Sequence, residues 1–201
     1  MIAMIEFIDN YTIDKQFYYG TDNFETVWEK LINRFFSVKN KEKYFPRAYW
    51  IEKYRPNNEA DQYSSTLVPD SIMEYNKKLY ILDAKYYRYG VYPNLGLSAL
   101  PRSADINKQI TYGQYAYEKY GSNYENVFNA FIMPFNKYDN KFQTDNEFIN
   151  VAEAGGYWIA KPNSYERVQG ILADTGYVLK NYDGNHDLDK EKLSIEIEKA
   201  L

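Results

Sequence analysis

A short apolar run that ends in alternating charged residues limits the folds open to this chain more than any other feature. Leu79-Tyr80-Ile81-Leu82 is followed directly by Asp83-Ala84-Lys85. Such a run has the length and composition of a buried strand. A second apolar run at residues 66–75 precedes it, and the polar pair Asn76-Lys77 between the two runs favours a turn. The sequence therefore predicts a hairpin of adjacent strands, 66–75 and 78–87.

Two carboxylates and a lysine can converge on this hairpin. Asp70 lies in the first strand and Asp83 in the second, and side chains alternate along a strand, so Asp83 and Lys85 share one face. Two carboxylates can bind a hard cation such as Mg²⁺ and leave positions for water and a phosphate oxygen. The cation would lower the pKa of its bound water, and the lysine would orient that water or offset transition-state charge. This arrangement favours phosphodiester hydrolysis.

The pattern Asp-x-Lys has two competing interpretations. It is also typical of the solvated face of an edge strand, so the three residues do not identify a nuclease by themselves. Paired carboxylates occur in glycoside hydrolases as well, but that chemistry gives no reason for Lys85 to lie two residues beyond Asp83.

Hydrophobic spacing predicts the remaining elements. A first helix is expected from Phe24 to Phe35 and a second from Asp105 to about Tyr120, where Gly121 would end it. The other expected elements are a strand at 1–8, an irregular segment or edge strand at 44–58, strands at 127–134 and 148–159, a strand or short helix at 168–179, and a helix at 189–201.

Composition is consistent with a single domain over residues 1–201. Hydrophobic residues make up 45% and charged residues 26%, and no Pro/Gly/Ser-rich stretch divides the chain. The absence of cysteine excludes disulfides and thiolate metal sites, and a single histidine excludes a multi-His zinc site. That histidine, His186, lies in a polar string and is expected to be a solvated turn residue.

Charge and hydropathy restrict the cellular location and the partners that we expect. Neither a secretory signal nor an apolar run of the roughly 20 residues that span a bilayer is recognised, so we expect a cytoplasmic protein without membrane contact. The net charge of −4 is weak support for a nucleic-acid partner, although a nuclease can confine its basic groups to one cleft. Aromatic residues reach 18%, which fits either an amphipathic core and surface or stacking on bases.

Several motifs resemble one family of nucleases. Pro69-Asp70 and Leu82-Asp83-Ala84-Lys85-Tyr86, on either side of the turn, resemble the PD-(D/E)xK signature. More narrowly, Tyr19-Gly20-Thr21 with Val27-Trp28-Glu29, and the segment 103–109 with Tyr112, are similar to the LlaJI-type restriction endonuclease family. The resemblance implies an α/β fold with a PD-(D/E)xK restriction-endonuclease-like core, in which helices flank a central mixed sheet. That core would span about residues 19–174.

The resemblance also implies roles for individual residues. Asp70, Asp83 and Glu29 would bind Mg²⁺, with Mn²⁺ as a substitute, and Lys85 would be the catalytic lysine. Gln109 would touch that lysine, a water or the DNA backbone, and Lys108 would contact phosphate. The competing interpretations are a solvated helix charge for Glu29, an ordinary amphipathic helix position for Gln109 and a solvated lysine for Lys108.

Double-stranded DNA is the partner that the resemblance implies. Because cutting both strands usually needs two active centres, a homodimer is a second expectation. Similar nucleases work beside a McrB-like AAA+ GTPase or a DNA-recognition subunit. No Gly-x-x-x-x-Gly-Lys-Ser/Thr loop occurs in the chain, so nucleotide hydrolysis would belong to a partner. Family members are often longer, and little room precedes Tyr19, so we expect a nuclease domain or short subunit; the alternative is an inert DNA-binding or assembly subunit.

Overall fold

A five-stranded mixed sheet forms the centre of the computed structural model, which we describe for residues 23–50, 62–92 and 94–199. The strand order is β3-β4-β5-β7-β6. Strands β4, β5 and β7 run parallel, whereas the outer strands β3 and β6 are antiparallel to their neighbours. The strand bounds are β3 (Ser71–Tyr75), β4 (Lys78–Ala84), β5 (Asn126–Phe135), β6 (Phe148–Ala154) and β7 (Val168–Asp174). The expected α/β class with a central mixed sheet is confirmed.

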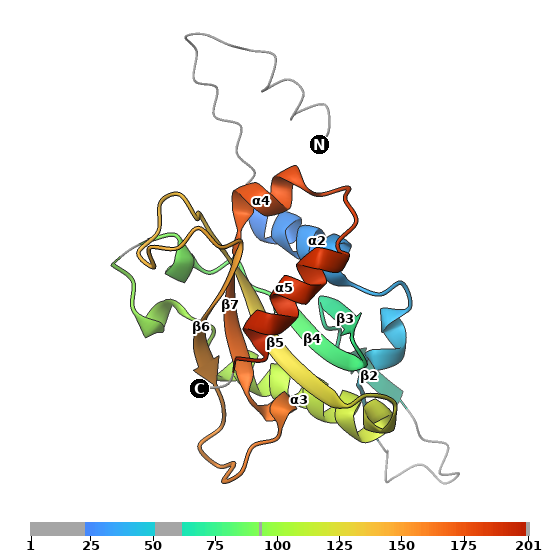
Figure 1. Cartoon of the computed structure of the whole chain (residues 1–201). Coiled ribbons are helices and arrows are strands. Elements are labelled where there is room, and N and C mark those ends of the chain that lie inside the picture. The colour runs from blue at the N-terminus through green and yellow to red at the C-terminus, as the bar shows by residue number, and fades with distance from the viewer. Residues whose placement is uncertain (1–22, 51–61, 93, 200–201) are drawn as a thin grey trace, which may run out of the picture.

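Helices cover both faces of this sheet (Figure 1). One face packs against α2 (Phe24–Phe36), α4 (Thr175–Lys180) and α5 (Asp187–Ile197), and the other packs against α3 (Ser103–Tyr120). The connections contain short 3₁₀ helices, namely η1 (Lys41–Tyr44), η2 (Arg88–Gly90), η3 (Leu97–Ala99), η4 (Gly121–Asn123) and η5 (Ser164–Glu166). No helix in the described part of the chain is long and apolar enough to span a membrane.

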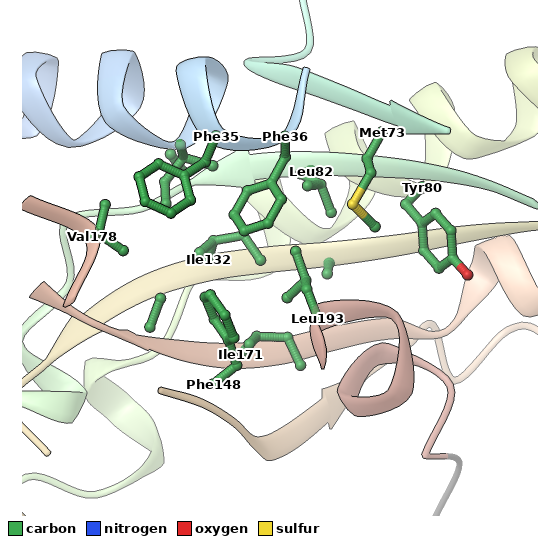
Figure 2. Packing of buried hydrophobic residues seen from close by; sticks show 14 of the residues in the cluster. Phe35, Phe36, Met73, Tyr80, Leu82, Ile132, Phe148, Ile171, Val178 and Leu193 are labelled. Carbon is green, nitrogen blue, oxygen red and sulfur yellow. The ribbon is translucent and has the colours of Figure 1, made fainter. Parts of the chain in front are cut away.

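The larger core lies between the sheet and the helices α2, α4 and α5 (Figure 2). Alternate residues of the strands point into it, as the period of two requires. Phe35, Phe36 and Leu193 from the helices meet Leu82 and Ile132 from the sheet. Trp28 is fully buried in the same layer, and its indole N–H donates to the carbonyl of Ile132 at 2.9 Å. The helical spacing that predicted the first helix therefore describes its buried face.

The hairpin forms as expected, but its strands are shorter than the sequence indicates. The turn residues Asn76 and Lys77 both have positive φ, at 46° and 57°, which is typical of a two-residue hairpin turn. The expected strand 66–75 was wrong as one element, because Pro69 interrupts it. Thr66 ends β2 (Gln62–Thr66), which pairs with β1 (Arg47–Trp50) in a separate two-stranded sheet, while Ser71 begins β3. Strand β4 ends at Ala84, so Lys85 follows the strand.

The C-terminal third differs from expectation in detail. Strand β6 ends at Ala154, so the expected extension to residue 159 was wrong. The segment 168–179 contains both a strand, β7, and the start of a helix, α4. Helix α5 starts at Asp187, two residues earlier than expected. Residues 1–8, 51–58 and 200–201, for which further structure was expected, lie outside the described residues.

His186 is not the solvated turn residue that the sequence indicated. Its side chain is 9% exposed, and its ring stacks on Phe35 with the centroids 3.9 Å apart. The Nδ1 atom lies 3.1 Å from the carboxylate of Asp189, which also accepts a hydrogen bond from the Tyr177 hydroxyl at 2.6 Å. The expectation was wrong because it rested on the polar residues around His186 in the sequence, whereas the imidazole packs on the aromatic end of α2.

Candidate active site

Asp70 and Asp83 lie at the same end of the hairpin. Ser71 pairs with Leu82, so Asp70 occupies the next position along the register, beside Asp83 on β4. A carboxylate oxygen of Asp70 accepts a hydrogen bond from the backbone N–H of Ala84 at 2.8 Å. This bond fixes the Asp70 side chain against the end of β4. The convergence of the two carboxylates that the sequence predicts is therefore present.

The Asp83 carboxylate is buried and paired with cations alone. Its residue is 2% exposed, and neither carboxylate oxygen receives a well-oriented hydrogen bond from any described residue. Lys85 Nζ lies 2.6 Å from one oxygen, and Lys108 Nζ lies 3.9 Å from the other. A buried carboxylate needs compensation of this kind, because loss of hydration is costly. The oxygens keep lone pairs that a bound cation could use.

Asp70 has a raised pKa of about 6. Burial is the largest cause, and the neighbouring charges of Asp83 and then Glu29 add to it. The hydrogen bond from Ala84 and the charge of Lys85 act in the opposite direction. Two carboxylates that repel each other in a partly buried position form an arrangement that a divalent cation would relieve.

Lys85 is held as a charged ammonium. Burial favours its neutral form, but the carboxylates of Asp83 and Asp105 outweigh burial and raise the pKa of Lys85 above its usual value. Its backbone N–H donates to the carbonyl of Ile132 at 2.9 Å, which extends the pairing with β5 one residue past the end of β4. A lysine held in this way can orient a water or offset negative charge, but it is poorly suited to accept a proton.

Asp105 also belongs to the site, although the sequence did not lead us to expect a role for it. One of its carboxylate oxygens lies 3.4 Å from Lys85 Nζ. The other accepts hydrogen bonds from the Tyr87 hydroxyl at 3.1 Å and from the Arg102 backbone N–H at 3.3 Å. Asp105 therefore belongs both to the first turn of α3 and to the ion-pair network of Lys85. The sequence feature that could have predicted this role is the spacing along the helix. Asp105 lies three residues before Lys108 and four before Gln109, which places all three on one helix face.

Lys108 and Gln109 reach the site from the same helix in different ways. The side chain of Lys108 is 43% exposed, and its ammonium lies between Asp83 and the ring of Tyr112, 5.5 Å from the ring centroid. Gln109 is 1% exposed and donates from Nε2 to the carbonyl of Ile81 at 2.8 Å and to the side-chain oxygen of Asn129 at 3.3 Å. The structure thus places Lys108 at the surface of the site and the Gln109 amide on the backbone of β4.

Glu29 lies on the exposed side of α2, and its charge contributes to the raised pKa of Asp70. Within the described residues, however, no group of three or more Asp, Glu, His or Cys side chains is arranged to hold a metal ion. The structure therefore brings together Asp70, Asp83, Lys85 and Lys108, and leaves Glu29 at the margin. A pair of carboxylate oxygens with no nitrogen or sulfur ligand suits a hard cation such as Mg²⁺ or Mn²⁺ better than Zn²⁺.

Comparisons with known proteins agree on one family. Residues 2–155 match the model of the family described as LlaJI restriction endonuclease, and this range includes the whole candidate site. The chain is also similar to the type II restriction enzyme BsuMI component YdjA of Bacillus subtilis (strain 168), with 34% identity over 156 residues. That similarity covers 73% of this chain but 32% of the relative, so the chain spans about a third of the length of the curated relative it matches.

Proposed function

The chain belongs to the LlaJI restriction endonuclease family, and from this membership we propose that it is a metal-dependent endonuclease of double-stranded DNA, acting as the nuclease domain or subunit of a restriction system. The observation that carries the proposal is the group formed by Asp70, Asp83 and Lys85. Two converging carboxylates and a charged lysine, at the ends of neighbouring strands, are suited to metal-assisted hydrolysis of a phosphodiester.

Each residue of this group has a distinct role in the proposal. Asp70 and Asp83 would hold Mg²⁺ or Mn²⁺ with Glu29 approaching from α2, and the cation, when bound, supplies Lewis acidity and an acidified water. Lys85, fixed by Asp83 and Asp105, would orient that water toward the phosphorus and offset the charge that develops on the phosphate oxygens. Lys108, the more exposed cation, would bind a phosphate of the same strand.

Gln109 is proposed to act on the geometry of the site. Its bonds to Ile81 and Asn129 tie α3 to β4 and β5. These bonds set the distance between Asp83 on the strand and Lys108 on the helix. The resemblance also implies direct contact with the lysine, a water or DNA, which stays a prediction.

We assign the single domain of residues 1–201 to the PD-(D/E)xK fold. Support comes from the order of the elements, in which α2 is followed by the β3–β4 hairpin, then by α3 and the parallel strand β5. The charged motif lies at the end of the hairpin, and α2 and α3 lie on opposite faces of the sheet. The PD-(D/E)xK resemblance implied helices that flank a central mixed sheet, and this arrangement agrees with it.

A partner subunit is part of the proposal, because the relative in Bacillus subtilis is by its description one component of a type II restriction enzyme. We expect this chain to work with a recognition subunit or a McrB-like AAA+ GTPase, and to cut both strands as a homodimer or within a larger assembly.

A second candidate function is an inert assembly or DNA-binding subunit that keeps the fold. The observation in its favour is that only two carboxylates converge, with no third acidic or histidine ligand grouped with them in the described residues. The nuclease is preferred because Lys85 and Asp105 complete a charge arrangement that an inert scaffold would not need.

Cleavage of plasmid DNA by the purified protein tests the choice. We expect cutting that requires Mg²⁺ or Mn²⁺, stops with EDTA, and is abolished by Asp83→Asn and by Lys85→Ala. The exposed residues Asp145 and Lys161 provide charge-matched controls, Asp145→Asn and Lys161→Ala, which should cut normally. Cutting that survives Asp83→Asn would show that the site is elsewhere. If cutting needs a partner fraction, the same variants are compared in its presence.

A further inference from the structure

The connection that follows α2 covers the free edge of β3 next to Asp70. The backbone N–H of Val38 donates to the carbonyl of Ile72 at 2.8 Å, and the Ile72 N–H donates to the hydroxyl of Ser37 at 3.3 Å. Lys41 reaches further, since its ammonium donates to the backbone carbonyl of Asp70 at 2.5 Å. Lys41 is therefore held beside Asp70, and the rest of the connection lies along β3 as far as Glu74, which accepts a hydrogen bond from the Tyr44 hydroxyl at 2.8 Å.

This connection is basic in an acidic chain. The segment 39–47 contains four basic residues and one acidic residue, whereas the whole chain has a net charge of −4. Lys41 is used structurally, because it also donates to Asn33 and its pKa is lowered by burial. Lys39 is exposed and makes no ion pair with any residue in the described part of the chain. Lys43 is exposed, and its ammonium lies 3.5 Å from a carboxylate oxygen of Glu74 and 4.6 Å from the ring centroid of Tyr44, which are weak surface contacts.

A projecting two-stranded ribbon continues from this segment. Strand β1 starts at Arg47, all four of its residues are exposed, and it pairs with β2 outside the main sheet. Tyr49 is 61% exposed and Trp50 is 75% exposed. Ribbons of this width fit the major groove of B-form DNA, and aromatic side chains can contact bases. The chain returns from β2 through Val68 and Pro69 directly to Asp70.

We propose that the segment 39–47 and the β1–β2 ribbon form the docking surface for a DNA duplex, with Lys39 and Lys43 on backbone phosphates and Trp50 toward a groove. The proposal rests on the proposed function and names the side from which the substrate approaches. A duplex is favoured over an acidic protein partner because the surface adjoins the carboxylates that are proposed to act on a phosphodiester. The docking surface also adds to the positive charge of Lys108, which reaches the site from α3.

The test is the salt dependence of duplex binding in the cleavage-deficient Asp83→Asn background with EDTA. Each phosphate contact contributes about 0.9 to the slope of log affinity against log salt, so Lys39→Ala with Lys43→Ala should lower the slope by about 2 and weaken binding roughly tenfold. Trp50→Ala should weaken binding roughly fivefold without changing the slope, since an aromatic contact releases no counterions. Thermal melts check that each variant is folded.

The matched control is Lys161→Ala with Lys199→Ala, which removes two exposed lysines. Lys161 lies in the connection between β6 and η5, and the backbone carbonyl of Lys199 accepts a hydrogen bond from Asn150 of β6, at the opposite edge of the sheet. We expect its slope to equal that of the parent. A slope that is unchanged in the Lys39 and Lys43 double variant, or reduced equally by the control, would overturn the docking surface and leave the nuclease proposal standing. Binding that depends on Lys39 and Lys43, together with no metal-dependent cutting by the wild type even when the partner fraction is present, would overturn the nuclease proposal alone.

Discussion

At the scale of single residues, the burial of Asp70 and its repulsion by Asp83 together have a measurable effect on stability. The pKa of Asp70 rises from 3.8 to about 6 on folding, so ionisation of Asp70 opposes folding. Stability that is present below about pH 4 is therefore lost as the pH rises through about 6. The carboxylate pair is a strained feature of the metal-free protein, as is common at functional sites.

Asp70→Asn should therefore stabilise the metal-free protein at neutral pH. We expect a gain of about 1–2 kcal/mol in the free energy of unfolding at about pH 8, and a much smaller gain at about pH 4.5. The amide oxygen of asparagine can still accept the Ala84 hydrogen bond, so little is lost. Urea unfolding in EDTA at the two pH values measures the difference. A variant that is equally stable or less stable than the wild type at the higher pH would contradict the destabilising effect of the buried Asp70 charge beside Asp83.

Asp105 should be a positioning residue for Lys85. Asp105→Asn removes the second carboxylate that raises the pKa of Lys85 while keeping a similar shape. We expect kcat to fall by roughly tenfold with little change in KM, because an effect of this size is typical when a transition-state contact is misplaced. The pKa of Lys85 should also fall towards its usual value, because one of the carboxylates that raise it is removed. Asp187→Asn, at a highly exposed position on α5, is the matched control.

A purely structural role for Asp105 would change the results in a recognisable way. The variant would then lower the melting temperature, while kcat of the folded fraction would match that of the wild type. Tyr87→Phe removes one hydrogen bond to Asp105 and leaves its charge, so it should have a smaller effect on kcat than Asp105→Asn.

At the scale of elements, the close packing of α3 on β5 sets the relation between the two halves of the site. A Cβ atom at Gly113 would overlap the side-chain amide of Asn129 and lie 2.9 Å from Tyr165 Cβ. Asn129 is fully buried, and its amide donates to the backbone carbonyls of Gln109 and Tyr165. The helix can therefore approach the sheet only because residue 113 has no side chain.

Gly113→Ala should push α3 away from the sheet. We expect a loss of about 2–3 kcal/mol in the free energy of unfolding, the range found when a packed interior is overfilled. Cleavage should fall as well, because Asp105 and Lys108 move with the helix. Gly96→Ala is the control, since nothing lies within 4 Å of a Cβ at that position. Equal stability of the two variants, measured by chemical denaturation, would show that the helix can adjust at no cost.

The elements that the sequence predicted are those with a strong local signal. The apolar spacing of Phe24 to Phe35 and the polar pair Asn76-Lys77 are local patterns that decide a helix and a turn. The division of the 66–75 strand at Pro69 could also have been anticipated, because proline rarely lies inside a paired strand. The burial of His186 against Phe35 could not, since the two residues are 151 positions apart and meet only through tertiary packing.

The residues of the candidate site were likewise predictable where local patterns determine their positions, and not where tertiary packing does. Asp70, Asp83 and Lys85 followed from strand alternation and a hairpin, which are local. The participation of Asp105 depends on where α3 begins relative to the end of β4, and the commitment of Gln109 to the β4 backbone depends on how closely α3 approaches. The roles proposed for Glu29 and Lys108 come from the family resemblance and stay predictions.

At the scale of the whole molecule, charge is distributed unevenly. The net charge of −4 is weak support for a nucleic-acid partner, yet exposed basic residues lie along the β3 edge and at the start of α3, on either side of the carboxylate pair. Local potential, not net charge, guides a polyanion to a site. A bound cation would neutralise part of the charge of the acidic residues at the centre. Metal binding would thereby reduce the repulsion between these residues and the phosphates of DNA.

Calorimetric titration of the purified protein with Mn²⁺ tests the central claim most directly, because it needs neither a partner subunit nor a recognition sequence. We predict saturable binding to the wild type that is lost in Asp70→Asn and in Asp83→Asn and retained in Asp145→Asn. Binding should also raise the melting temperature of the wild type and not of the first two variants. Binding that is unchanged in both site variants, or absent from the folded wild type even with a DNA duplex present, would contradict a metal-dependent nuclease centred on Asp70 and Asp83.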